Sequence, residues 1–119
     1  MLPRRRVRPP ELRGARLASG VRVSALLRRV AAAGGFGAVI VRGDATAGSI
    51  AVIARDRGEP RLLERSMALE GGYEWRDVAV GEAIDSWVDR ACRRDPDLWV
   101  IELDIPDAAR FVAETDLGD

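Results

Sequence analysis

The sequence of 119 residues contains no histidine, lysine, asparagine or glutamine, so every basic side chain is an arginine. Without an imidazole, a serine or cysteine nucleophile cannot be activated as it is in the hydrolase triads. Without a lysine, the chain can form neither a Schiff base nor the lysine contact of a P-loop. These absences exclude several large classes of enzyme. We attribute the replacement of lysine by arginine to genome base composition rather than to function.

Cysteine is almost absent as well, because Cys92 is the only one. A single cysteine cannot form a disulfide within the chain, and without histidine it cannot build an ordinary structural zinc site. No apolar run approaches the ~20 residues of a membrane-spanning helix. The basic start MLPRRRVRPP is not followed by the apolar stretch of a signal peptide. We therefore expect a cytoplasmic protein with no cofactor, no metal and no membrane contact.

Charge is balanced over the whole chain but divided along it. Residues 1–29 hold nine arginines against one acid, a formal charge of +8, and the remaining residues hold ten arginines against 18 acids, a formal charge of −8. Residues 1–14 also contain three prolines, which predict a flexible arm. The globular composition of the rest predicts one domain over residues 15–115, with a frayed tail over residues 116–119.

Two segments have the apolar spacing of a helix that packs on one side. Over residues 22–33 and 81–94, apolar residues recur at i, i+3, i+4 and i+7, and Arg22 lies mainly off the first of these faces. The apolar residues are Val23, Leu26, Leu27 and Val30 in the first segment and Ile84, Trp87, Val88 and Ala91 in the second. Gly34-Gly35 predicts the end of the first helix. A short last helix is expected after Pro106, over DAARFVAE.

The remaining apolar segments predict strands. We expect them over residues 36–42, 49–55, 61–66 and 98–105, with a short strand over 15–21 and an additional edge strand near 74–78. Segment 36–42 is apolar at successive positions, which favours a strand covered on both faces. Segment 61–66 is polar enough for a sheet edge. Short turns join the first three strands, so we expect an antiparallel meander in which 36–42 and 49–55 pair as a hairpin.

The predicted fold is α+β, because amphipathic helices need an apolar sheet face to cover. It is an antiparallel β-meander covered on one face by two amphipathic helices, in the order (β)αβββ(β)αβα. The second face of the sheet would then remain open to a partner.

Three motifs resemble a family of small bacterial proteins known as domain of unknown function 1491. They are VSALLRR at residues 23–29, RGDATAGSI at residues 42–50 and DPDLWVIELD at residues 95–104, and the last is the most specific. The resemblance covers roughly residues 15–105. It implies a single-domain cytoplasmic bacterial protein without an established activity, and it transfers no catalytic residue. Members of that family often have an aromatic residue just before the first helix, where this chain has Gly20-Val21-Arg22.

The stretch GDATAG at residues 43–48 is a candidate anion site, because consecutive amides in a turn can point at a phosphate. Gly43, Asp44 and Gly48 would form it. No Walker or GxGxxG pattern is present, and a strand rather than a helix follows. The stronger interpretation is a turn between two strands, for which the glycines would supply positive φ angles.

The first functional hypothesis is a non-catalytic protein-interaction or regulatory module. It would present its open sheet face or edge to a protein partner or, as a homodimer, to a second copy. Trp75 lies between Glu74 and Arg76 and is the tryptophan best suited to a surface contact.

The alternative hypothesis is a nucleic-acid-associated protein that uses the arginine-rich arm. Its contacts would be Arg4, Arg5, Arg6 and Arg8. A tail that only improves solubility, or a misassigned start codon, explains the arm equally well.

A metal-dependent nuclease would be the enzymatic extension of this alternative. It requires that the carboxylates of one helix face (Glu82, Asp85 and Asp89) and one strand face (Glu102 and Asp104) converge on Mg²⁺. Two separate solvated faces are the simpler interpretation.

Overall fold

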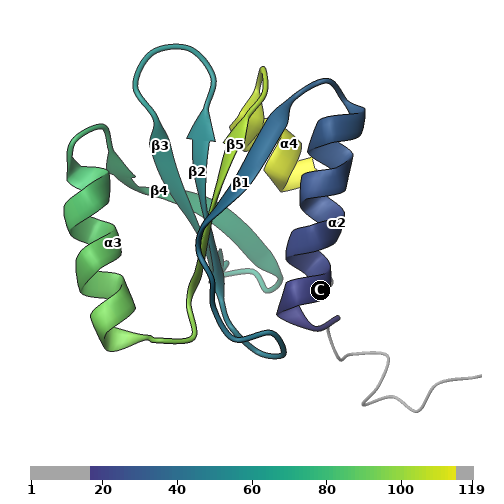
Figure 1. Cartoon of the computed structure of the whole chain (residues 1–119). Coiled ribbons are helices and arrows are strands. Elements are labelled where there is room, and N and C mark those ends of the chain that lie inside the picture. Colours follow the sequence, from purple (N-terminus) through teal and green to yellow (C-terminus); the bar gives the residue numbers. More distant parts are fainter. Residues whose placement is uncertain (1–16, 115–119) are drawn as a thin grey trace, which may run out of the picture.

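Five strands form one mixed sheet with helices on both faces, in the computed structural model that describes residues 17–114 (Figure 1). The elements are α2 (Ser19–Ala32), β1 (Phe36–Val41), β2 (Ile50–Arg55), β3 (Arg61–Met67), β4 (Tyr73–Val80), α3 (Ala83–Arg94), β5 (Trp99–Asp104) and α4 (Ala108–Glu114). The α+β class and the order of these elements are confirmed. The expected arm at residues 1–14 and tail at residues 116–119 lie outside the described residues.

Helix α2 begins earlier than its apolar spacing predicts, and the strand expected over residues 15–21 is wrong. The amides of Ser19 and Gly20 donate to the carbonyls of Thr46 (3.1 Å) and Ala45 (2.8 Å), so a distant loop caps the first turn in place of a side chain. The end of the helix is as predicted. Gly34 has a φ of 90° there, and the amide of Gly35 donates to the carbonyl of Val30 (2.9 Å), which is a Schellman ending.

The strand order is β1-β5-β2-β3-β4. Strands β2, β3 and β4 form an antiparallel meander, as expected. The hairpin between residues 36–42 and 49–55 is wrong, because β5 lies between β1 and β2, antiparallel to the first and parallel to the second. The physical reason is the burial of β5, whose residues are mostly buried. Because β5 is apolar on both faces, it is stable in an inner position between β1 and β2. The edges are therefore β1 and β4, and β3, expected at an edge, is an inner strand.

Helices cover both faces of the sheet, so the expectation that both long helices share one face is wrong. Helices α2 and α4 pack on one face, where Val52 and Ile101 are buried in what we call the first core. Helix α3 packs on the opposite face, where Ala51 and Val100 are buried in the second core. Successive residues of β2 and β5 thus point into different cores. Helix α3 covers the central part of the sheet face that was expected to stay open, around Ala51 and Val100 (Figure 1).

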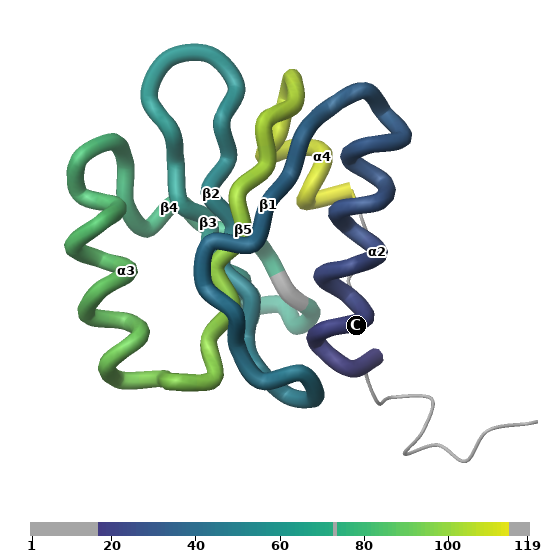
Figure 2. The backbone as a smooth tube through the Cα atoms, in the orientation of Figure 1, coloured from purple at the N-terminus to yellow at the C-terminus, as the bar shows by residue number. Residues whose placement is uncertain are grey.

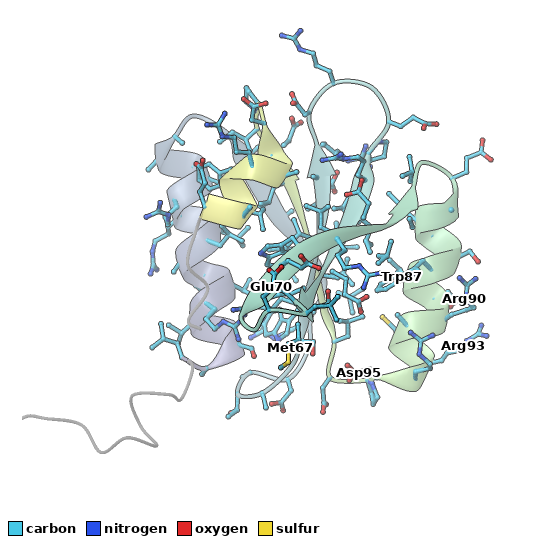
Figure 3. All side chains as sticks on the ribbon, turned by 180° about the vertical axis from the view of Figure 1, so that it is seen from behind. Met67, Glu70, Trp87, Arg90, Arg93 and Asp95 are labelled. Carbon is cyan, nitrogen blue, oxygen red and sulfur yellow. The ribbon has the colours of Figure 1, made fainter. Side chains whose placement is uncertain are left out.

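Helix α3 places its apolar stripe as the sequence predicts. Ile84 and Ala91 are buried in the second core, and Trp87 packs against it. Trp87 lies between the helix and the sheet, whereas Arg90 and Arg93 lie on the outer side of the helix (Figure 3). No helix in the described part of the chain combines the length and apolar character needed to cross a membrane.

Candidate functional site

The 43–48 loop joins β1 to β2 by crossing the chain that enters β5 (Figure 2). The amide of Asp44 donates to the carbonyl of Asp97 (3.0 Å), and the amide of Trp99 donates to the carbonyl of Ser49 (2.8 Å). The indole Nε1 of Trp99 donates to the carbonyl of Asp44 (2.7 Å). The loop therefore reverses the chain, as expected, but it does so over an intervening strand rather than within a hairpin.

The glycines at the two ends of this loop are needed for close approach. Neither Gly43 nor Gly48 has a positive φ, which corrects the expectation from the sequence. A Cβ atom on either residue would lie within 3.0 Å of both the Asp97 carbonyl oxygen and the Trp99 ring. Any larger residue would therefore push the loop away from β5.

The amides inside the loop are occupied by the loop itself. Oδ2 of Asp44 accepts hydrogen bonds from the amides of Thr46 (3.0 Å) and Ala47 (2.8 Å). These are the donors that a bound anion would use, and the Asp44 carboxylate takes its place. The anion site at Gly43, Asp44 and Gly48 stays a prediction that this geometry does not favour.

Further contacts tie the loop to its surroundings. Buried Ser19 donates from Oγ to the carbonyl of Gly48 (2.6 Å), which joins α2 to the loop. The guanidinium carbon of Arg42 lies 5.4 Å from the centroid of the Trp99 ring, within the range of a cation–π contact. Helix α2, the loop and β5 are thus locked together at this end of the sheet.

A cavity of about 350 Å³ opens beside the loop, and we call it the Trp75 pocket. Its walls come from the first turn of α2, the loop, β3 and β4, and they include Ser19, Arg22, Thr46, Glu64, Arg65 and Trp75. Trp75, singled out as a surface aromatic, is half-buried and packs against the first core.

Arg22 was expected mainly off the apolar face of its helix, and this is wrong, because the residue is only 8% exposed and lines the pocket. A signal for it was present in the sequence. Arg22 precedes Leu26 by four residues and follows Ser19 by three, which places all three on the buried side of α2.

The structure does not bring the two sets of candidate metal-binding carboxylates together. Glu82, just before α3, and Asp85 and Asp89 on α3 are exposed. Glu102 and Asp104 lie on β5, where Glu102 forms an ion pair with Arg55. Within residues 17–114, no three histidine, cysteine, aspartate or glutamate side chains lie close enough to share a metal ion. Arg4, Arg5, Arg6 and Arg8, the expected nucleic-acid contacts, lie outside the described residues.

Strand β1 forms an edge of the sheet with no charged residue in its sequence FGAVIV. Phe36, Ile40 and Val39 are 71%, 49% and 39% exposed, although the apolar pattern of this strand predicted cover on both faces. A bulge interrupts its pairing with β5 between Val39 and Val41. This apolar edge, which we call the β1 edge, faces the viewer in Figure 1.

Comparison with known proteins agrees with the fold. The family described as "Protein of unknown function (DUF1491)" matches residues 17–113, and the chain belongs to this family. The crystal structure of a DUF1491 family protein from Caulobacter crescentus CB15 is 34% identical, with a TM-score of 0.71, and the match covers 80% of this chain and 94% of that one. An NMR structure of a DUF1491 family protein from the same organism is 35% identical, with a TM-score of 0.68, over 82% of this chain and 93% of that one.

A solution structure of protein Atu0922 from A. tumefaciens is 37% identical, with a TM-score of 0.68, and the match covers 82% of this chain and 92% of that one. No protein with a curated description matches the sequence.

Proposed function

We propose that this protein is a non-catalytic interaction module that accepts an added β-strand along the β1 edge, and that the strand comes from a second copy of the chain. The observation that carries the proposal is the exposure of Phe36, Val39 and Ile40 on an uncharged edge strand.

The outer side of an edge strand presents backbone amides and carbonyls that an additional strand can pair with. Proteins that avoid such pairing place charges or proline in their edge strands, and β1 has neither. Its bulge protects only the end near Val41, which leaves residues 36–39 regular. The β1 edge therefore combines backbone groups ready for pairing with apolar side chains that pairing would cover.

A second copy suits this edge because two identical strands can pair antiparallel about a two-fold axis, with each surface contacting its equivalent. The absence of charge in β1 means that this self-pairing brings no like charges of the strand together. Since the regular stretch covers only residues 36–39, the interface is small, and we expect a weak dimer with a dissociation constant of roughly 10 μM or weaker.

Sedimentation equilibrium from about 10 μM to 1 mM tests the proposal. The wild type should change from monomer to dimer across this range, and Phe36→Lys should stay monomeric. The control is Met67→Lys, because Met67 is 69% exposed and Phe36 is 71% exposed. Met67 lies on β3, which β5 and β2 separate from the β1 edge. A wild type that is monomeric throughout, or a control that weakens association as much as Phe36→Lys, would overturn the proposal.

The alternative function, binding of nucleic acid through Arg4, Arg5, Arg6 and Arg8, stays a prediction that rests on the excess of arginine in residues 1–29. It predicts salt-dependent retention on DNA or RNA that is lost when residues 1–14 are deleted. Retention that is unchanged by the deletion would remove the arm from consideration. A cytoplasmic location is likewise part of our proposal, supported by the single cysteine.

A further inference from the structure

We propose that the Trp75 pocket binds a small molecule in which a phosphate or carboxylate group is attached to a planar ring. This site lies apart from the β1 edge, and the inference does not depend on the proposed function. It rests on three properties of the pocket: its size, the charge of its walls and the aromatic ring that it contains.

The size of the pocket fits a small ligand. Its volume of about 350 Å³ falls within the range of roughly 300–1,000 Å³ that is usual for ligand sites. Its walls come from α2, the 43–48 loop, β3 and β4, which are far apart in the sequence. The hydrogen bond from Ser19 to Gly48 and the loop's contacts with β5 hold two of these walls in place. The cavity is therefore formed by the fold itself rather than by one irregular loop.

The charge of the walls favours an anion. Two arginines, Arg22 and Arg65, line the pocket against a single acid, Glu64. Arg22 is 8% exposed, and a charge-assisted hydrogen bond to an anion is stronger in such a sheltered place than in open solvent. A guanidinium has five N–H donors in a planar fork, so it can hold an oxyanion in addition to the contacts it already makes. A phosphate and a carboxylate both match this fork.

The aromatic ring favours a planar group beside the anion. Trp75 combines packing against the first core with a place in the pocket wall. Ile50 and Leu98, both buried, also line the pocket and add apolar surface to it. A flat ring can pack against such a surface while its charged substituent contacts the arginines.

Titration of the full chain with three probes, followed by ¹H–¹⁵N NMR, tests this inference. Adenosine monophosphate carries a phosphate and a ring, benzoate carries a carboxylate and a ring, and inorganic phosphate carries the anion alone. We expect the amides of Ser19, Arg65 and Trp75 to shift with at least one ring-bearing probe, and to shift less with inorganic phosphate at the same concentration. The probe that binds more tightly, adenosine monophosphate or benzoate, then shows whether the pocket prefers a phosphate or a carboxylate.

Two arginine variants and two matched controls locate the binding. Arg65→Gln should weaken the binding of the best probe at least about tenfold, because a charge-assisted hydrogen bond is lost. Arg76→Gln is its control on the neighbouring strand, since Arg76 is exposed and outside the pocket wall. Arg22→Gln should also weaken the binding of the best probe, and Arg29→Gln is its control at an exposed position on the same helix. If Arg22→Gln fails to fold, the comparison of Arg65→Gln with Arg76→Gln still decides the test.

Three results would overturn the inference. The first is the absence of shifts in the pocket with either ring-bearing probe up to about 10 mM. The second is equal binding by Arg65→Gln and Arg76→Gln, which would place any bound anion elsewhere. The third is that inorganic phosphate shifts the pocket amides as much as the ring-bearing probes do, which would show that the ring does not contribute to binding.

Discussion

The replacement Gly43→Ala tests whether the 43–48 loop is pinned over the entry of β5. A Cβ atom on Gly43 would lie within 3.0 Å of the Asp97 carbonyl oxygen, the Trp99 ring and the backbone carbon of Leu98. Two of these atoms belong to the backbone and cannot turn away as a flexible side chain can. The loop must therefore lift from β5, and this motion would lengthen the hydrogen bond from the Trp99 indole to the Asp44 carbonyl.

The cost can be assembled from two contributions. Overpacking of a tight interior site costs typically about 1–3 kcal/mol. Loss of the indole hydrogen bond adds about 1 kcal/mol. The free energy of unfolding should therefore fall by about 2–4 kcal/mol, which for a domain of this size lowers the melting temperature by roughly 8–16 °C.

Urea unfolding followed by far-ultraviolet circular dichroism measures this loss, and the NMR signal of the Trp99 indole N–H reports on the loop directly. Gly20→Ala is the matched control, because a Cβ there comes no closer than 3.5 Å to its nearest neighbour, Ala45 of the same loop. Within α2 this change should leave stability the same or raise it by up to about 1 kcal/mol. Equal stability of Gly43→Ala and Gly20→Ala, with an unmoved indole signal, would refute the close approach of loop and strand.

Two further predictions concern the contacts of α2. Ser19→Ala removes the buried hydrogen bond to the Gly48 carbonyl and should cost about 1–3 kcal/mol in urea unfolding, whereas Ser24→Ala, an exposed position on the same helix, should stay within about 0.5 kcal/mol of the wild type. Equal effects of the two changes would contradict the role of this bond. Leu26→Ala should cost about 2–5 kcal/mol because Leu26 is fully buried in the first core, whereas Leu69→Ala, at a fully exposed position, should have no measurable effect in thermal unfolding. A small loss for Leu26→Ala would mean that α2 does not cover this face.

The features that the sequence predicted correctly are those that local spacing determines. The apolar faces of the two long helices need only residues three and four apart, and Leu26 and Ile84 are buried as their patterns predict. The end of α2 just before Gly34 follows from a single glycine that can adopt a positive φ. The meander of β2, β3 and β4 follows from short turns between neighbouring strands.

The features that the sequence did not predict depend on contacts between distant segments. The start of α2 is fixed by hydrogen bonds to the carbonyls of Ala45 and Thr46. No residue near Ser19 in the sequence predicts these bonds, because their acceptors lie in a distant loop. The place of β5 depends on pairing with β1, more than 50 residues earlier, and short turns elsewhere favoured the hairpin instead. The burial of Arg22 was missed for another reason, because its position was assigned mainly off the apolar face, although it lies one helical turn before Leu26.

The apolar pattern of the strands had two physical explanations, and the fold separates them strand by strand. A strand that is apolar on both sides is either covered on both faces or left with an apolar surface that something else must cover. For β2 and β5 the first explanation holds, because α2 and α4 cover one face and α3 covers the other. For β1 it fails, since Phe36 and Ile40 stay exposed although the same helices are present. Val41 of β1 packs against the second core, but the exposed apolar side chains of β1 are not accounted for by the folding of residues 17–114 alone. We therefore place the proposed interaction at the β1 edge.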